Sequence, residues 1–151
     1  MTLDLMSTAP PPHVVQVQGF FANLSPMAFR KWACQYYGCA APLLLQTEFS
    51  LVPYFLLCRA IELELKADHL ETKRQPEVKR DFGHYLAKSY AALPAHRQVL
   101  TASDLDLLKE ADAIYSAKGF EYFNPKHALR GNSQYPDLSS LNDLTRKLLA
   151  P

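Results

Sequence analysis

The chain has 151 residues, with 16 lysines and arginines against 15 aspartates and glutamates, and 48% of its residues are hydrophobic. This is the composition of one ordinary soluble globular domain, and it excludes a disordered tail or a fibrous repeat. The apolar residues include 24 Leu and 18 Ala but only 6 Val and 2 Ile, which favours helices over strands. A net charge of +1 excludes a broadly basic surface, so any contact with nucleic acid must be local.

The N-terminus has no secretory signal, because Asp4 stands where such a signal carries positive charge and no long apolar segment follows. The longest strongly apolar run, residues 51–58, is too short to span a bilayer. Three cysteines are an odd number and favour buried thiols over disulfides or a metal site. No nucleotide-binding or catalytic fingerprint occurs. We therefore expect a cytoplasmic protein without membrane contact, metal or cofactor.

Residues 1–24 form a predicted N-terminal arm, since the Pro-rich stretch 8–13 is stiff and extended rather than helical. The single helical domain then covers residues 25–151. Its first helix begins at Ser25, an N-cap followed by a proline in the first turn, and is predicted to end at Gly38.

The second helix is predicted to begin after Ser50, with Pro53 in its first turn, and to run to about Lys73. The polar stretch 72–80 is predicted to be a loop centred on Pro76. A short third helix follows, because apolar residues recur at helical spacing up to Pro94. These residues are Phe82, Leu86, Tyr90 and Leu93.

The fourth helix is predicted to begin at one of two overlapping capping boxes, Thr101 with Asp104 or Ser103 with Asp106, and to close at Gly119. Residues 120–136 are irregular. Asp137 caps a last helix that turns three leucines inward, namely Leu141, Leu144 and Leu148. Five helices without a long repeat predict an all-α fold, a single helical bundle with an extended N-terminal arm.

The second helix has two apolar stripes on roughly opposite sides, so we expect neighbours on both. One stripe is Leu56, Ala60, Leu63, Ala67 and Leu70, and the other is Tyr54, Leu57, Cys58, Ile61 and Leu65. Two polar seams separate them: an acidic one with Glu64, Asp68 and Glu71, and a mixed one with Arg59, Glu62, Lys66, His69 and Lys73. The mixed seam is either a solvated strip of paired charges or a partly buried polar site.

Charge is distributed unevenly. Residues 1–58 hold four charged side chains, whereas residues 59–110 hold nine basic and nine acidic ones. A helical domain with so little charge in its first third has more apolar surface than one core readily hides. We therefore expect a homodimer that uses the first helix and the start of the second, with a compact monomer as the alternative.

The stretch 54–67 and the later Gly83-His-Tyr-Leu86 resemble the HEPN superfamily, whose members often carry an A-x-E-x-x-L-K-A-like second helix and a G-H-x-L helix start. Gln134-Tyr-Pro136 is similar to the R-Y-P turn before the last helix in some members, with glutamine replacing arginine. The resemblance covers residues 50–149. It implies a HEPN-like four- to five-helix up-down bundle, frequent homodimers, and association with nucleotides, RNA or the protein partner of a toxin–antitoxin or defence pair.

The chain departs from the nuclease branch of this superfamily, whose members resemble one another through an Arg-x4–6-His motif. Arg80 lies too close to His84, and the correctly spaced residue is Lys79, which lacks the bidentate fork of arginine. We therefore expect no ribonuclease activity of the usual type.

Two groups of side chains are candidate sites. The first group, Arg59, Glu62, Lys66 and His84, forms either a polar binding site or a polar core. The second group is a basic loop that either binds phosphate or is simply solvated. Its residues are Lys73, Arg74, Lys79 and Arg80. An aromatic run with interleaved cations either stacks a base or packs onto the bundle. It comprises Phe120, Tyr122, Phe123, Lys126, His127, Arg130 and Tyr135.

The function expected from these observations is that of a dimeric, non-catalytic HEPN-like module that binds a protein, a nucleotide or RNA. The alternatives are a degenerate metal-independent ribonuclease that uses Lys79, His84 and the basic loop, and a purely structural interaction protein.

Overall fold

The computed structural model describes residues 15–17, 20–22, 25–122 and 134–150, and within these residues the domain is all-α. A two-stranded hairpin precedes the helices. The elements are β1 (Val15–Val17), β2 (Phe20–Ala22), α1 (Ser25–Ala40), η1 (Ala41–Leu45), α2 (Val52–Leu70), α3 (Gln75–Phe82), α4 (Leu86–Ala91), η2 (Ala95–Arg97), α5 (Ala102–Tyr115) and α7 (Leu138–Leu149). The predicted helical class is therefore confirmed.

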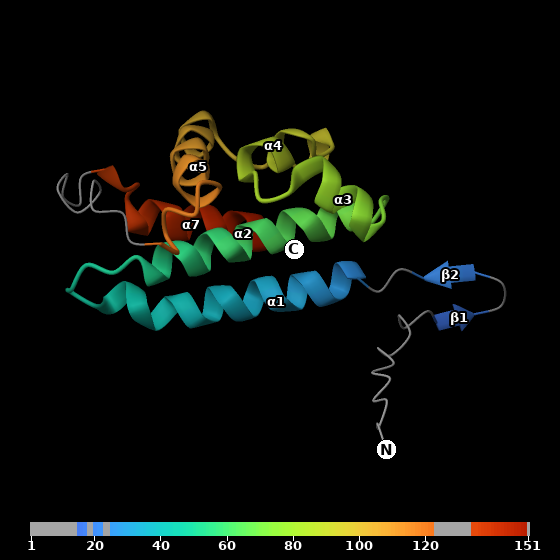
Figure 1. Ribbon diagram of the computed structural model, residues 1–151, viewed down its shortest axis with the longest axis horizontal. Helices are drawn as coiled ribbons and strands as arrows, with labels where there is room; N and C mark the ends of the chain where they lie inside the picture. Colours follow the sequence, from blue (N-terminus) through green and yellow to red (C-terminus); the bar gives the residue numbers. More distant parts are fainter. Residues whose placement is uncertain (1–14, 18–19, 23–24, 123–133, 151) are drawn as a thin grey trace, which may run out of the picture.

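Helix α2 is the centre of the domain. Helix α1 runs back along one side of it as the other arm of a long hairpin, while α7 lies along it and α5 runs across it (Figure 1). The second apolar stripe of α2 is buried in a core shared with α4, α5 and α7. Four residues of the first stripe are buried as well, and α1 packs along α2, so the prediction that α2 is covered on two sides is confirmed.

The predicted caps of α5 and α7 are confirmed. The Asp104 N–H bonds the Thr101 hydroxyl at 3.3 Å, and the Thr101 N–H donates to the Asp104 carboxylate at 2.9 Å. The Asp137 carboxylate accepts the Ser140 N–H at 2.8 Å. The leucines predicted to face inward from α7 are all buried. These caps place α5 and α7 at fixed starting points on either side of the core.

Two predicted helix ends are wrong. Helix α1 continues through Gly38 to Ala40, because burial of Ala40 outweighs the roughly 1 kcal/mol that glycine costs inside a helix. Helix α2 ends at Leu70 instead of Lys73. Ser50 lies one residue before the N-cap Leu51, although its hydroxyl still accepts the Val52 N–H at 3.2 Å.

The predicted loop 72–80 is also wrong, since residues 75–82 form α3. Pro76 lies in the first turn, where its missing N–H breaks no helical bond. The Glu77 carboxylate accepts the Arg74 N–H at 2.8 Å and closes this turn. Gly83, with φ of 55°, then ends α3 in a conformation that side chains disfavour. The predicted third helix is consequently split, with Phe82 in α3 and the short α4 beginning at Leu86.

Most of the predicted N-terminal arm lies outside the described residues. The part that the structure describes is the antiparallel pair β1–β2, in which Val15 faces Ala22 and Val17 faces Phe20.

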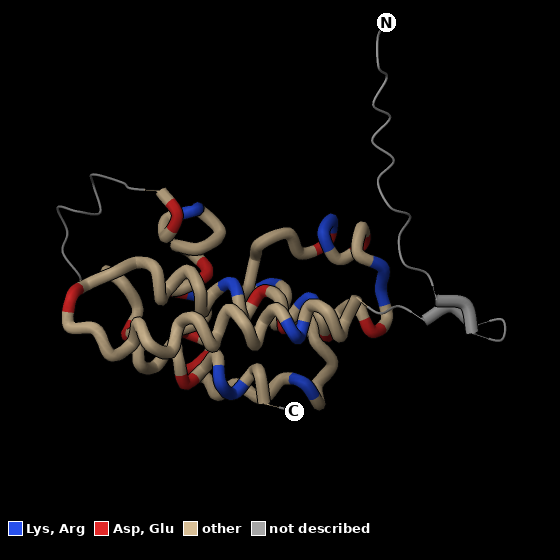
Figure 2. The backbone as a smooth tube through the Cα atoms, turned by 90° about the horizontal axis from the view of Figure 1, so that it is seen from below, with Lys and Arg blue, Asp and Glu red and all other residues tan. Residues whose placement is uncertain are grey.

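The acidic seam of α2 is paired with arginines from two other segments. Arg30 of α1 reaches Glu64 at 3.2 Å, Asp68 at 2.7 Å and Glu71 at 2.6 Å. Arg97 of η2 binds Asp68 from the other side, with a shortest distance of 2.8 Å. Helix α1 is thus attached to α2 by one arginine as well as by packing. Seen from the α1 side, most of the chain is drawn in the colour of uncharged residues (Figure 2).

Candidate functional site

Four side chains predicted as one polar site come together around the carboxylate of Glu62. Arg59 Nη1 lies 3.0 Å from Glu62 Oε2, and His84 Nδ1 lies 3.1 Å from Oε1. Lys66 also donates to this carboxylate. Arg59, Glu62 and Lys66 lie on successive turns of α2, whereas His84 comes from the turn between α3 and α4. The structure therefore brings the whole predicted group together; this cluster is called the Glu62 site below.

A fifth member, Tyr115 at the end of α5, was not among the predicted site residues. Its hydroxyl donates to Glu62 from the buried side of the cluster. Burial and the neighbouring Glu62 charge both raise the pKa of Tyr115, so the hydroxyl keeps its proton and remains a donor. A signal was present in the sequence, since Tyr115 follows Leu108 and Ala111 on one face of α5.

Glu62 is a buried carboxylate that stays ionised. Its residue is only 2% exposed. Burial alone would raise the pKa of this carboxyl, but hydrogen bonds from Lys66 and Tyr115 and the charges of Lys66 and Arg59 outweigh burial and lower the pKa to about 2. The negative charge is therefore permanent near neutral pH and lies at the bottom of the site.

The cations around Glu62 face outward. The Arg59 side chain is 31% exposed, that of Lys66 is 15% exposed and that of His84 is 49% exposed. Glu62 carries one negative charge and is bound by Arg59 and Lys66, whose side chains are more exposed than the acid. A solvated strip of paired charges would expose the acid as well. The site is therefore partly buried, with its acid inside and its cations at the rim.

The predicted phosphate-binding loop does not form a single cluster. Lys79 and Arg80 belong to α3, whereas Lys73 precedes it, and Asp81 holds Lys73 at 3.1 Å and Arg80 at 2.9 Å. Lys73 also lies over the Phe82 ring, 4.8 Å from its centre. Arg74 precedes the helix at its N-cap. Lys79 lines a cavity together with a member of the Glu62 site, namely Lys66.

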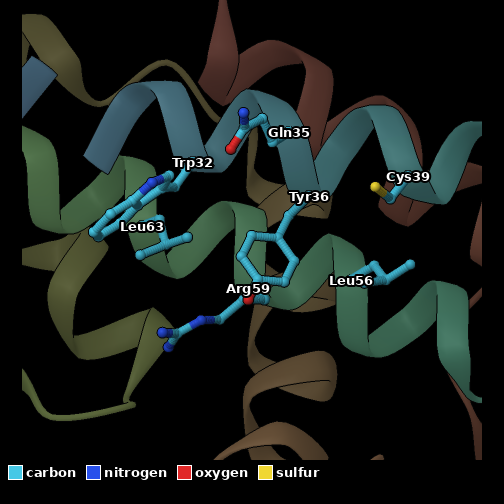
Figure 3. A pocket seen from close by; sticks show the side chains of 7 residues that line it. All are labelled: Trp32, Gln35, Tyr36, Cys39, Leu56, Arg59 and Leu63. Atoms are coloured by element: carbon cyan, nitrogen blue, oxygen red, sulfur yellow. The ribbon is translucent and has the colours of Figure 1, made fainter. Parts of the chain in front are cut away.

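An aromatic groove that the sequence did not predict lies between α1 and α2 beside the Glu62 site. Figure 3 shows Trp32 and Tyr36 from α1 beside Arg59 and Leu63 from α2. This cavity, the Trp32 pocket, has a volume of about 520 Å³. Trp32 is 49% exposed, and the Arg59 guanidinium lies 6.0 Å from the centre of the Tyr36 ring. The groove therefore offers aromatic surface and a cation side by side.

A second cavity continues the groove towards α3 and is called the Lys79 pocket here. It has a volume of about 410 Å³. Its lining comprises Phe29, Lys66, Leu70, Gln75, Pro76, Val78 and Lys79. The Phe29 ring lies 5.6 Å from the Trp32 ring, which belongs to the first pocket. This ring contact therefore brings one residue of each lining together.

The predicted aromatic run is divided. Phe120 stacks on Tyr54 at 5.4 Å between ring centres, and Tyr135 lies 5.8 Å from the same ring, so these two pack onto the bundle. Tyr122 is exposed. The remaining residues of that run, Phe123, Lys126, His127 and Arg130, lie outside the described residues.

The cysteine prediction is partly wrong. Cys58 is buried as expected, but Cys34 and Cys39 are exposed on α1, and all three thiols are free. Across the described part of the chain, no group of three or more potential ligands is placed to hold a metal ion. Within the same residues, no helix has the length and apolar character needed to cross a membrane.

Comparison of the chain with protein-family models, with curated proteins and with solved structures gave no match. The geometry of the Glu62 site and its groove is therefore the basis for a functional proposal.

Proposed function

We propose that this chain is a non-catalytic, HEPN-like helical-bundle module that binds a nucleotide or single-stranded RNA at the Glu62 site and the adjoining groove. The observation that carries the proposal is a pair of cations, Arg59 and Lys66, held by a buried carboxylate, with Arg59 lining the same pocket as the half-exposed Trp32. Proteins that bind single strands combine cations for the phosphates with aromatic rings for the bases, and each stacked base contributes about 1–3 kcal/mol. The neutral protein as a whole attracts RNA weakly, so affinity must come from this site.

Preorganisation supports the proposal. A flexible surface lysine or arginine loses side-chain entropy when it binds a phosphate. Here Glu62 already fixes Arg59 and Lys66, so part of that cost is met during folding. His84 adds a third nitrogen-bearing side chain at the rim.

Trp32 provides the test, because it is the single tryptophan of the chain and lines the pocket. Titration with adenosine monophosphate and with an oligoribonucleotide should change its fluorescence to saturation. Arg59→Ala is expected to weaken binding about 10-fold, as one charge-assisted contact of 1–3 kcal/mol predicts. The matched control Lys109→Ala changes an exposed cation on α5 and should bind like wild type. Absence of any saturable change at millimolar ligand would refute the proposal.

Two further readouts accompany this titration. Bound ligand should slow alkylation of Cys39, which lines the pocket, but not of the exposed Cys34 on the same helix.

RNA incubated with the protein and a chelator should stay intact. His84 has its Nδ1 oriented by the Glu62 carboxylate, an arrangement that also suits a general base. Cleavage that disappears in His84→Ala would therefore favour a degenerate ribonuclease instead.

A homodimer is the second part of the proposal. Apolar side chains are exposed along α1 and at its turn into α2, among them Met27, Leu45, Phe49 and Val52. A contact at this turn leaves the Trp32 pocket open. Light scattering should give twice the 17.1 kDa chain mass, and Leu45→Asp should yield the monomer with an unchanged circular dichroism spectrum. A wild-type monomer at micromolar concentration contradicts this part alone.

A protein partner of a toxin–antitoxin or defence pair is the alternative occupant of the same exposed surface. A cytoplasmic location belongs to the proposal too, and the three free thiols agree with a reducing compartment.

A further inference from the structure

The groove has two pockets, and their spacing bears on which ligand fits. Arg59 borders the Trp32 pocket, and Lys66 borders the Lys79 pocket. Both residues lie on α2, seven positions apart, which corresponds to about 10 Å along the helix axis. The Glu62 carboxylate lies between them and binds both cations. The Glu62 carboxylate therefore holds one cation beside each pocket.

Each pocket is large enough for one nucleoside. Their volumes, about 520 Å³ and about 410 Å³, fall within the usual range for small-ligand sites. Each pocket also offers a ring: Trp32 in the first and Phe29 in the second. Leu63 and Leu70 lie on the same apolar stripe of α2 and line one pocket each. The lining is thus repeated: a ring from α1, and a leucine and a cation from α2.

We propose that the groove binds two nucleosides linked through phosphate, with one base in each pocket and the linking phosphate on Arg59 and Lys66. The inference rests on the proposed function and deepens it, because it names the ligand as a dinucleotide unit rather than a mononucleotide. Lys79 then acts as the specificity-determining residue for the second unit. Two other cations of the predicted phosphate-binding loop, Lys73 and Arg80, are both bound by Asp81.

Charge complementarity favours this occupant over an apolar peptide. The described part of the groove carries Arg59, Lys66 and Lys79 at its edge, and Glu62 is covered by its partners. A ligand with a negative charge between two flat apolar groups suits this groove, because the charge would meet the cations of α2 and each flat group would enter one pocket. A phosphodiester-linked RNA segment and a pyrophosphate-linked free dinucleotide share this chemistry.

The test compares ligands of different length by Trp32 fluorescence. Adenosine monophosphate, the phosphodiester ApA and pyrophosphate-linked diadenosine are titrated into wild type, Lys79→Ala and Arg80→Ala. A linked ligand is expected to bind at least 10-fold more tightly than the mononucleotide. Lys79→Ala should remove this advantage without changing mononucleotide affinity, and Arg80→Ala, the neighbouring exposed cation, should keep it. Tighter binding of ApA would identify an RNA segment as the ligand, and tighter binding of the pyrophosphate-linked diadenosine would identify a free dinucleotide.

The outcomes separate the two proposals. Equal affinity for mononucleotide and linked ligands, or the same loss for both in Lys79→Ala, overturns the two-pocket inference and leaves nucleotide binding in place. Failure of every ligand to bind overturns both. Circular dichroism of the variants checks folding, which these exposed side chains are not expected to affect.

Discussion

Glu62→Ala is expected to lower the free energy of unfolding by about 3 kcal/mol, because it removes the shared acceptor of a buried polar cluster. The Tyr115 hydroxyl would be left buried without this acceptor. Arg59 and Lys66 would lose their common counter-charge, although their exposure lets water compensate in part. Urea denaturation measures the change.

Glu110→Ala is the matched control, since Glu110 is an exposed acid on α5. Its effect should stay within about 0.5 kcal/mol, as for surface substitutions in general. An effect of Glu62→Ala as small as that of the control would contradict the view that this carboxylate organises the site. Glu62→Gln tests whether the cluster is structural or binds a ligand. If the cluster is purely structural, the substitution lowers the free energy of unfolding and leaves ligand affinity of the folded protein unchanged. A binding site loses both, because Arg59 and Lys66 are no longer fixed.

Acid is expected to destabilise the domain through the same carboxylate. The pKa of Glu62 is lowered from 4.5 to about 2 in the folded protein, so its contribution is complete above pH 4.5. That contribution is lost as pH falls from 4.5 towards 2, because the unfolded chain takes up the proton first. The shift corresponds to about 3 kcal/mol. Wild type should therefore lose more stability over this window than Glu62→Gln, and equal losses would refute the assignment.

His69 adds a separate and milder acid response. It is buried, its Nε2 lies 2.9 Å from the Ser89 carbonyl oxygen, and its ring stacks on Phe82 at 4.0 Å. Burial lowers the pKa of His69 below the usual 6.5, with a smaller contribution from the Lys73 charge in the same direction. The neutral form is favoured in the folded state, so this contribution is present above pH 6.5 and declines below it. Glu62→Gln should leave this decline below pH 6.5 unchanged, because His69 is not among the partners of Glu62.

Much of the fold followed from local rules. The caps at Thr101 and Asp137 were predictable because a side chain bonds a backbone group three residues away, which needs no knowledge of tertiary structure. The predictions at Gly38 and Pro76 were wrong because a local preference was applied where packing, or the position in the helix, decides the structure. Both residues usually interrupt helices, but packing of Ala40 carries α1 past the first, and the second lies in an opening turn that tolerates it.

The site was predictable where it lies on one helix. Arg59, Glu62 and Lys66 share a face of α2 by spacing alone, and His84 entered through the resemblance to a helix start. Tyr115 and the Trp32 pocket depend on how α5 and α1 pack against α2. Trp32 and Tyr36 lie one turn apart on α1, but spacing within α1 does not reveal that they border Arg59. The spacing of residues within one helix does not show which residues of other helices contact it.

A carboxylate on α5, that of Asp112, helps to position the Glu62 site. Asp112 accepts the backbone N–H groups of Leu86 at 2.8 Å and Ala87 at 3.3 Å, and so fixes the start of α4 directly after His84. One turn further along α5, Tyr115 binds Glu62. The same helix therefore anchors two opposite walls of the site. Local unfolding of α5 would release the start of α4 next to His84 and expose Glu62 together, so the geometry of the Glu62 site and the docking of α5 form one cooperative unit.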